Sequence, residues 1–285
     1  MSQPALAHLV TSADGTRIGY QTVGAGVGTG EDGVIVVGGA LRTAQDYLPF
    51  ALRLARHRVV HVMDRRGRGA SGPQGPSYTI EKECQDLFAV QAATGAVDVF
   101  GHSYGGLVTL EAARRAPVFT RIAVYEPGVS IGGSIPTAWM ARYRQLLEAG
   151  DTRGAFAHFL KESGHAPRAV KAMPEWYLRT VLRLVIRKPQ WRRMEPLLEA
   201  NLAEHEQVIA LDDTVAGYAA ITANTLLLGG GHSPAFTARI PLEALHRAIP
   251  TSTVAIIDRL DHTAPDEKAP EAVADRVLRF LQSST

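Results

Sequence analysis

The feature that most constrains the fold is an alternation of short apolar runs with helical segments. The apolar runs, rich in β-branched residues, lie at 34–37, 59–63, 97–100 and 122–125. The helical segments that follow the first three runs lie at 44–55, 79–94 and 107–115. Continuous apolar runs are typical of strands buried on both faces, and their alternation with helices favours a parallel sheet covered by helices. The sequence therefore predicts an α/β fold with a mostly parallel sheet flanked by helices.

The alternation is interrupted between residues 129 and 220. That stretch shows no convincing strand, and it has helical patterns at 138–147, 153–162, 176–186 and 195–209. Prolines lie near the boundaries of these segments, where they are tolerated. Apolar runs at 225–228 and 253–257, and helical segments at 242–248 and 271–281, then restore the alternation. We expect a core formed by 1–128 and 221–285, with an all-helical cap inserted at 129–220.

The ends of the chain and its composition add expectations about partners. Two short β-like runs, 8–11 and 17–23, flank the turn signal Asp14-Gly15 and predict a hairpin, and the Gly-rich 24–33 predicts a flexible loop. The net charge of +2 gives no reason to expect nucleic acid or a membrane as partner. The single cysteine excludes an internal disulfide. No leader-like segment or long apolar span is visible, so a cytoplasmic protein is expected.

The run Gly101-His102-Ser103-Tyr104-Gly105-Gly106 matches the pattern G-x-S-x-G between a predicted strand and a predicted helix. A sharp strand-to-helix turn needs small residues two positions before and after its centre, because strand and helix approach closely there. The hydroxyl of Ser103 would then lie at the carboxyl end of the sheet, beside a helix N-terminus that favours developing negative charge. The alternative is a serine that only caps the helix.

With these residues in view, the chain resembles the α/β-hydrolase superfamily over nearly its whole length, in particular serine esterases and lactonases with a helical cap. The resemblance rests on Gly101–Gly106, on the loop Asp64–Gly72, on Gly38-Gly39-Ala40 and on the late Leu260-Asp261-His262. It implies Ser103 as nucleophile and His262 as its base, since His262 precedes the final helix. His232, after the run at 225–228, is the rival base.

The carboxylate expected to orient the base His262 departs from the commonest pattern of the superfamily. The loop Gly229–Pro234, where relatives usually carry an aspartate, has no carboxylate. Some relatives carry the acid one strand earlier, which implies Glu126 here. The alternatives are Asp258, Asp261, Asp266 or a dyad without an acid.

The resemblance also implies an oxyanion hole formed by backbone N–H groups of Tyr104 and Ala40, with Leu41 as second choice for Ala40. Gly38 stands where relatives often have histidine. The loop arginines Arg65, Arg66 and Arg68 are expected to be structural, and a stripe of Arg179, Arg183 and Arg187 to be solvated.

No dinucleotide, Walker or metal-ligand pattern is present, so chemistry without cofactor or metal is expected on a small-molecule substrate. The predicted reaction is hydrolysis of an ester, lactone or thioester through an acyl-enzyme. A cofactor-free lyase or cyclase using Ser103 and His262, and a ligand-binding member of the fold without turnover, stay open. The sequence does not indicate an oligomeric state.

Overall fold

The computed structural model describes residues 5–24, 32–164, 166 and 168–283. The strands are β1 (Leu6–Thr11), β2 (Arg17–Val23), β3 (Val34–Val37), β4 (Val60–Met63), β5 (Asp98–His102), β6 (Arg121–Tyr125), β7 (Asn224–Gly230) and β8 (Ser252–Ile257). They form one eight-stranded sheet in the order β1-β2-β4-β3-β5-β6-β7-β8. Strands β3 to β8 are parallel, and β1 and β2 form the predicted antiparallel hairpin at one edge. The predicted mostly parallel α/β fold is confirmed. Most of the Gly-rich loop predicted at 24–33 lies outside the described residues.

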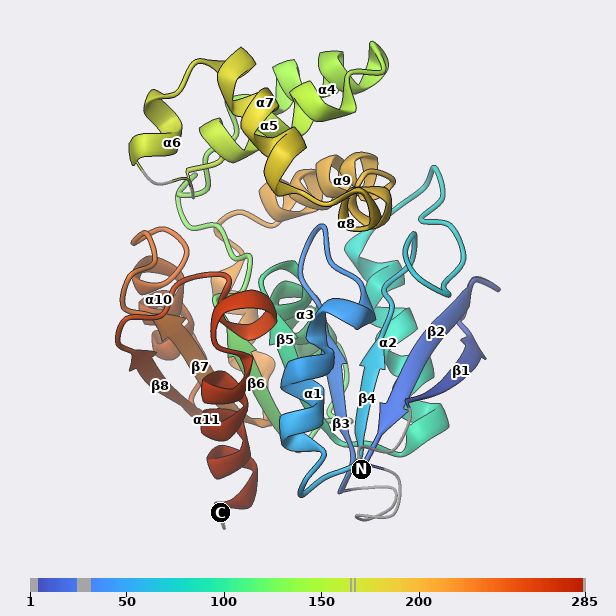
Figure 1. The fold of residues 1–285 in the computed structure, drawn as a ribbon. Helices are drawn as coiled ribbons and strands as arrows, with labels where there is room; N and C mark the ends of the chain where they lie inside the picture. The colour runs from blue at the N-terminus through green and yellow to red at the C-terminus, as the bar shows by residue number, and fades with distance from the viewer. Residues whose placement is uncertain (1–4, 25–31, 165, 167, 284–285) are drawn as a thin grey trace.

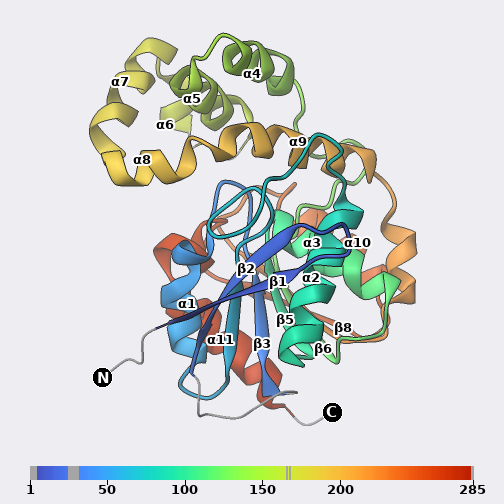
Figure 2. The same ribbon diagram turned by 90° about the vertical axis from the view of Figure 1, so that its right-hand side faces the viewer.

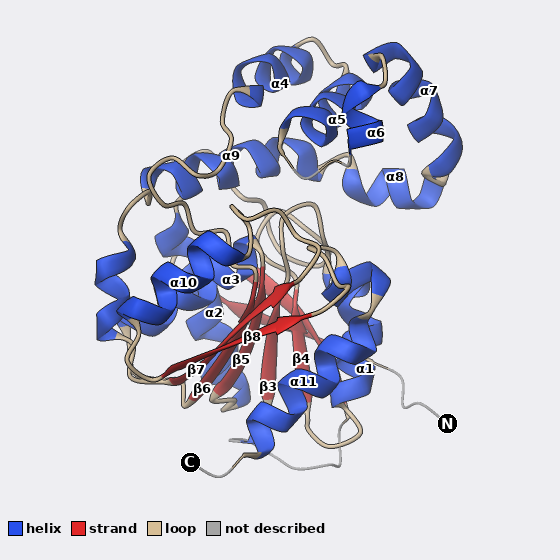
Figure 3. Ribbon diagram, turned by 90° about the vertical axis from the view of Figure 1, so that its left-hand side faces the viewer, coloured by secondary structure: helices blue, strands red, loops and turns tan. Residues whose placement is uncertain are grey.

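Helices cover both faces of the sheet (Figures 1 and 3). One face carries α1 (Leu48–Leu54) and α11 (Pro270–Gln282), and the other carries α2 (Ile80–Thr94), α3 (Tyr104–Arg115) and α10 (Arg239–Ala248). The fully buried β3 shows why its residues are apolar throughout. Ile35 and Val37 pack into the cluster with α2 and α3, and Val34 and Val36 pack into the cluster with α1 and α11, because successive side chains of a strand point to opposite faces.

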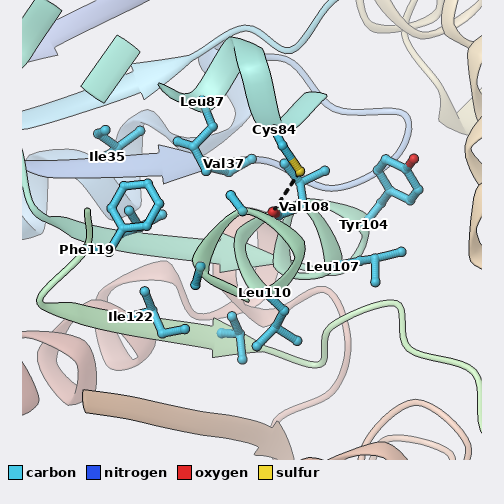
Figure 4. Packing of buried hydrophobic residues seen from close by; sticks show 14 of the residues in the cluster. Ile35, Val37, Cys84, Leu87, Tyr104, Leu107, Val108, Leu110, Phe119 and Ile122 are labelled. Atoms are coloured by element: carbon cyan, nitrogen blue, oxygen red, sulfur yellow. Dashed lines mark hydrogen bonds between the residues drawn. The ribbon is translucent and has the colours of Figure 1, made fainter. Parts of the chain in front are cut away.

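Helix α3 is the most deeply buried helix of the core. Every residue from Tyr104 to Ala113 is buried. Figure 4 shows Leu107, Val108 and Leu110 of this helix among the side chains of the sheet and of α2. A helix buried around its circumference is held against the sheet on one side and against neighbouring helices on the other. The packing fixes the position of its first residue and so of the residue before it, Ser103.

In the described part of the stretch between β6 and β7, six α-helices lie beyond the carboxyl ends of the parallel strands (Figures 1 and 2). They are α4 (Trp139–Glu148), α5 (Thr152–Glu162), α6 (Arg168–Ala172), α7 (Glu175–Val185), α8 (Lys188–Met194) and α9 (Leu197–Ala210). We call α4–α9 the helical layer. Its aromatic residues Trp139, Tyr143, Phe156 and Trp191 pack in a cluster of their own, which also takes in Leu41 from the core. The division of the chain into a core and a cap with boundaries at 129 and 220 stays a prediction.

Some details differ from the sequence prediction. Helix α3 begins at Tyr104 instead of at residue 107, and β7 continues through Gly229 and Gly230. Glycine is unfavourable in helices and strands, so both segments were expected to be shorter. On α7, Leu184 and Val185 are 81% and 68% exposed. No helix in the described part of the chain is long and apolar enough to cross a membrane.

Candidate active site

Ser103 is the single residue between strand β5 and helix α3. Its backbone has φ 55° and ψ −122°, a conformation that non-glycine residues rarely adopt. The Ser103 N–H donates to the carbonyl of Tyr125 at 3.0 Å, and the Ser103 carbonyl accepts from the N–H groups of Gly106 and Gly128, both at 2.9 Å. Strain of this kind persists only where the surroundings determine it, and it is concentrated at functional sites.

The glycines around Ser103 allow the close approach that this turn requires. A Cβ on Gly105 would collide with the backbone carbonyls of Val37 and Gly38, and a Cβ on Gly101 would collide with Thr109 and Gly105. Helix α3 can therefore begin directly against the end of β3 only because Gly105 has no side chain. The two small residues of the G-x-S-x-G pattern are thus explained by packing.

His262 lies in the loop between β8 and α11, where the sequence predicts the base. Its Nε2 is 3.0 Å from the Ser103 Oγ, and its Nδ1 is 2.8 Å from the Glu126 Oε2. The preceding residue anchors the loop, because the Asp261 carbonyl accepts from the Tyr125 hydroxyl at 2.9 Å. The three side chains predicted as a triad therefore form one chain of hydrogen bonds. Their catalytic roles stay predictions.

Glu126 follows β6 directly and has φ 43°, so its side chain turns back over the edge of the sheet. The residue is 1% exposed, and its second oxygen, Oε1, accepts from the Gly230 N–H at 2.7 Å. Burial acts to raise the pKa of Glu126, but the hydrogen bond and the charge of His262 outweigh it, and the pKa lies below its ordinary value. The carboxylate is therefore ionised at neutral pH.

The other candidate acids and the rival base are either exposed or bonded to other groups. Asp258 and His232 have exposed side chains. Asp261 bonds to Thr263 and pairs with Lys268, and Asp266 pairs with Arg42. Of the candidates that the sequence left open, Glu126 is the carboxylate bonded to the His262 ring.

The loop after β3 passes directly over Ser103. A Cβ on Gly39 would lie 3.1 Å from the Cβ of Ser103, and Ala40 and Tyr104 line a cavity together with Ser103. Leu41 has φ 57°, and its side chain packs into the helical layer. This arrangement brings the two predicted N–H donors to the nucleophile turn, while their role as an oxyanion hole stays a prediction.

A buried hydrogen-bonded relay connects the loop after β3 with the loop that carries His262. The Gly39 N–H donates to the Tyr47 hydroxyl at 2.8 Å, which lies 2.6 Å from the His102 Nδ1, and the His102 Nε2 is 2.9 Å from the His262 carbonyl. Because a carbonyl only accepts, His102 carries its proton on Nε2 and accepts from Tyr47. Burial, followed by the nearby His262, holds the pKa of His102 well below its usual range.

From the sequence, no functional role was assigned to His102 or to Tyr47. The position of His102 beside the nucleophile is the one sequence signal for this relay, and Tyr47 carries none, since its contact depends on how α1 is placed.

Two cavities meet at Ser103, and Ala40, His205 and His262 line both. The larger has a volume of about 190 Å³, and the helical layer contributes the apolar side chains Phe156, Phe159, Leu160 and Met194 to its lining. The smaller, about 50 Å³, lies among Ile135, Val208 and Phe236. A molecule bound with one of its bonds at the Ser103 hydroxyl can place a larger group in one cavity and a smaller group in the other.

The arginines of the loop 64–72 are structural, as expected, but their partners come from more distant elements. Arg65 donates to the Gly38 carbonyl at 2.9 Å and pairs with Glu83 at 2.9 Å. Both Arg65 and Arg68 pair with Glu204 of α9. Within the described ranges, no group of three or more His, Cys, Asp or Glu side chains could hold a metal ion.

The strand order, the serine at the strand-to-helix turn and the histidine after the last strand together define the class of α/β-hydrolase folds. The comparisons agree: the model of the alpha/beta hydrolase family matches residues 34–276. The chain belongs to the α/β-hydrolase family.

Known structures resemble the chain over almost its whole length. An alpha/beta hydrolase from Sphaerobacter thermophilus is 32% identical with a TM-score of 0.78, and the match covers 96% of this chain and 100% of that one. An N-formylmaleamic acid deformylase from Pseudomonas putida is 22% identical, with a TM-score of 0.68 and coverage of 95% and 99%. An enol-lactonase from Burkholderia xenovorans is 20% identical, with a TM-score of 0.71 and coverage of 96% and 100%. The last two likenesses concern the fold alone.

Proposed function

We propose that the protein is a serine hydrolase that cleaves an ester-like bond of a small apolar molecule through an acyl-enzyme on Ser103. The bond is that of an ester, a lactone or a thioester. The observation that carries the proposal is the chain of hydrogen bonds from Ser103 through His262 to Glu126, placed where two largely apolar cavities meet. The deformylase and the enol-lactonase of the same fold agree with a hydrolytic reaction.

In the proposed mechanism, the His262 Nε2 accepts the Ser103 hydroxyl proton while Oγ attacks the carbonyl carbon. Glu126 accepts the Nδ1–H of the same ring, which fixes the tautomer and stabilises the imidazolium. The N–H groups of Tyr104 and Ala40 stabilise the oxyanion. The imidazolium then protonates the leaving alcohol, and His262 next activates a water that releases the acid.

The proposed groups are expected to contribute to the reaction rate by different factors. A positioned general base accounts for a factor of about 10²–10⁴ in rate. A single oxyanion donor accounts for about 10²–10³. Burial and hydrogen bonding of Glu126 support the contribution of the general base His262, because an ionised carboxylate in a site of low dielectric stabilises the imidazolium strongly. Removal of Ser103 removes the covalent route altogether.

Labelling by a fluorophosphonate probe tests the proposal. We expect the probe to label the wild-type protein at Ser103 and p-nitrophenyl acetate to be hydrolysed, and both reactions to disappear in Ser103→Ala. A pure binding protein would show neither reaction, and a lyase or cyclase would convert its substrate without taking up ¹⁸O from labelled water. Either outcome would replace the hydrolase proposal.

The proposal includes a cytoplasmic location and a small molecule as sole partner, without nucleic acid or membrane. The single cysteine, the free and buried Cys84, and a net charge of +2 support this part. Secretion of the native protein into the medium would contradict it.

A further inference from the structure

The larger cavity beside Ser103 has room for one ring. Its volume is about 190 Å³, and an engineered apolar cavity of about 150 Å³ accepts benzene. Part of its wall is lined by the polar residues Arg42, Ser163, Thr263 and Asp266. The helical layer contributes aromatic and aliphatic side chains and two polar residues of α9, Asn201 and His205. These two residues lie four positions apart and therefore on the same side of the helix.

Asn201 offers an acceptor that the protein leaves unused. The residue is fully buried, and its Nδ2 donates to the Tyr143 hydroxyl at 3.4 Å. That hydroxyl already donates its own proton to the Leu198 carbonyl at 2.8 Å, so it can only accept from Asn201. This fixes the orientation of the amide. Its Oδ1 has no hydrogen-bond partner among the described residues. A buried unpaired acceptor is unfavourable and calls for an explanation.

His205 offers a second acceptor at the same cavity. Its Nδ1 is 2.8 Å from the Asn201 backbone carbonyl, so the proton is on Nδ1 and Nε2 is an acceptor. Burial lowers the pKa of His205, and the ring is neutral at pH 7. Edge-on contacts with Trp139 at 4.9 Å and with Phe159 at 5.6 Å hold the ring in place.

We propose that the larger cavity selects substrates whose ring carries a hydrogen-bond donor, a hydroxyl or an N–H group, that donates to Asn201 Oδ1 or to His205 Nε2. This inference rests on the proposed hydrolase function of Ser103. A ring without a donor would fill the same volume but leave both acceptors unpaired, and a site with buried polar groups discriminates strongly against such an analogue.

The smaller cavity limits the other side of the scissile bond. Its volume is about 50 Å³. A cavity of about 10–15 Å³ by the same measure holds one water molecule, so this one takes a group of only a few heavy atoms. The substrate class is therefore an ester that joins a hydroxylated or N–H-bearing ring to a short acyl or short alkoxy group.

Two matched series of esters test this selection. In the first, the ring is on the alcohol side: phenyl acetate, meta-hydroxyphenyl acetate and meta-methoxyphenyl acetate. In the second, it is on the acid side: methyl benzoate and its meta-hydroxy and meta-methoxy derivatives. The hydroxyl and methoxyl groups have similar electronic effects at this position, but only the hydroxyl donates. We expect kcat/KM for the hydroxyl substrate to exceed that for the methoxyl substrate by about tenfold or more in at least one series.

Three variants assign the preference to the two acceptors. Asn201→Leu and His205→Phe each remove one acceptor at similar volume, and each should reduce the hydroxyl preference severalfold through KM. If one of these two variants fails to fold, the other still tests the proposal. Met194→Leu is the apolar control, because Met194 lines the same cavity without an acceptor. It should change kcat/KM for the two substrates by the same factor.

Binding to Ser103→Ala, measured by calorimetry with meta-hydroxyphenyl and meta-methoxyphenyl acetate, tests the cavity separately from catalysis. Ser103-dependent hydrolysis without a hydroxyl preference would overturn the selection and leave the hydrolase proposal intact. Preferred binding of the hydroxyl ligand without hydrolysis by the wild type would support the selection while the hydrolase proposal failed. Equal binding of both ligands, or binding of neither, would overturn the selection.

Discussion

The two carboxylate oxygens of Glu126 have different partners, and the loss of either hydrogen bond is expected to affect kcat. One oxygen accepts from the His262 Nδ1 and the other from the Gly230 N–H. In Glu126→Gln the amide cannot accept at both positions or stabilise the imidazolium. We expect kcat of ester hydrolysis to fall by a factor of about 10³–10⁴. Steady-state kinetics on p-nitrophenyl acetate measures this.

The matched control for that substitution is Asp261→Asn, which makes the same chemical change next to His262. The Asp261 carboxylate pairs with the exposed Lys268 and is partly exposed itself. Loss of such a pair changes free energies by about 0–1 kcal/mol, so kcat should stay within about fivefold of the wild type. A large loss in Asp261→Asn combined with an active Glu126→Gln would assign the acid to Asp261 instead.

Tyr47 joins the loop after β3 to His102, because its hydroxyl accepts from the Gly39 N–H and donates to the His102 Nδ1. Burial raises the pKa of the Tyr47 phenol, so it stays protonated. Tyr47→Phe leaves the Gly39 N–H and the His102 Nδ1 without their partner. We expect a loss of about 1–3 kcal/mol in stability. We also expect kcat to fall by about tenfold with little change in KM, since Tyr47 itself lines neither cavity and acts by positioning the loops of Gly39 and His262.

Tyr218→Phe provides the control for Tyr47→Phe. Tyr218 is equally buried, and its hydroxyl donates to Glu111 at 2.9 Å, away from Ser103. Both variants should lose comparable stability in urea unfolding, but Tyr218→Phe should keep the wild-type kcat. Equal effects of the two variants on kcat would mean that Tyr47 acts through general stability alone.

At the scale of elements, the sheet contains a histidine that makes its stability sensitive to acid. His61 lies on β4 opposite Thr22 of β2, and its Nδ1 is 2.9 Å from the Thr22 hydroxyl. Burial, with a smaller effect of His8, lowers the pKa of His61 to about 4. An unfolded chain binds this proton near pH 6.5. The stability contributed by the neutral ring is therefore fully present above about pH 6.5 and is lost as the pH falls towards about 4.

His61→Leu removes this titration. The wild type should lose about 3 kcal/mol through His61 between about pH 7 and about pH 4. The variant starts from a somewhat lower stability at neutral pH, because Thr22 loses a partner. Urea unfolding at both pH values measures the difference. Parallel pH dependences in the two proteins would show that His61 titrates normally in the folded state.

The elements of the core could be predicted because their physical signals are local. Buried parallel strands such as β3 are apolar throughout, and the ends of such strands meet at one edge of the sheet. Ser103, Glu126 and His262 each follow a strand at this edge, which is why the sequence brings them together in a prediction. The short π-helical turn Ala264–Lys268, which places Asp266 against Arg42, has no comparable signal.

The relay and the polar side of the larger cavity could not be predicted, because they depend on contacts between distant elements. The hydroxyl of Tyr47 meets His102 across a separation of 55 residues. Asn201 and His205 have the spacing of one helix face, but only the placement of α9 over Ser103 turns that face towards a cavity.

For the whole molecule, the contact between the core and the helical layer includes a group of buried ion pairs. Arg65 and Arg68, after β4, are almost fully buried and pair with Glu204 of α9, and Arg65 also pairs with Glu83 of α2. Burial acts to raise the pKa of Glu204, but the two arginines outweigh it and keep the carboxylate ionised. Helix α9 also carries Asn201 and His205, so the same ion pairs hold the proposed selective wall of the cavity over Ser103.

Glu204→Gln tests these ion pairs. The charge of Arg68 then lacks its carboxylate partner while both groups stay buried. Breaking a buried pair in this way costs about 3–5 kcal/mol. Glu206→Gln on the same helix is the control, because Glu206 and its partner Arg144 are about half exposed. It should change the stability by less than about 1 kcal/mol.

Because of where the tryptophans lie, their fluorescence can report whether Glu204→Gln weakens the attachment of the helical layer. All three tryptophans, Trp139, Trp176 and Trp191, lie in the helical layer, so fluorescence reports on the layer while far-ultraviolet circular dichroism reports on the whole molecule. In Glu204→Gln we expect the fluorescence transition in urea to precede the dichroism transition, because the layer separates first. In the wild type and in Glu206→Gln the two transitions should coincide. Coincident transitions at an unchanged midpoint in Glu204→Gln would show that apolar packing, and not the buried charges, holds the layer on the core.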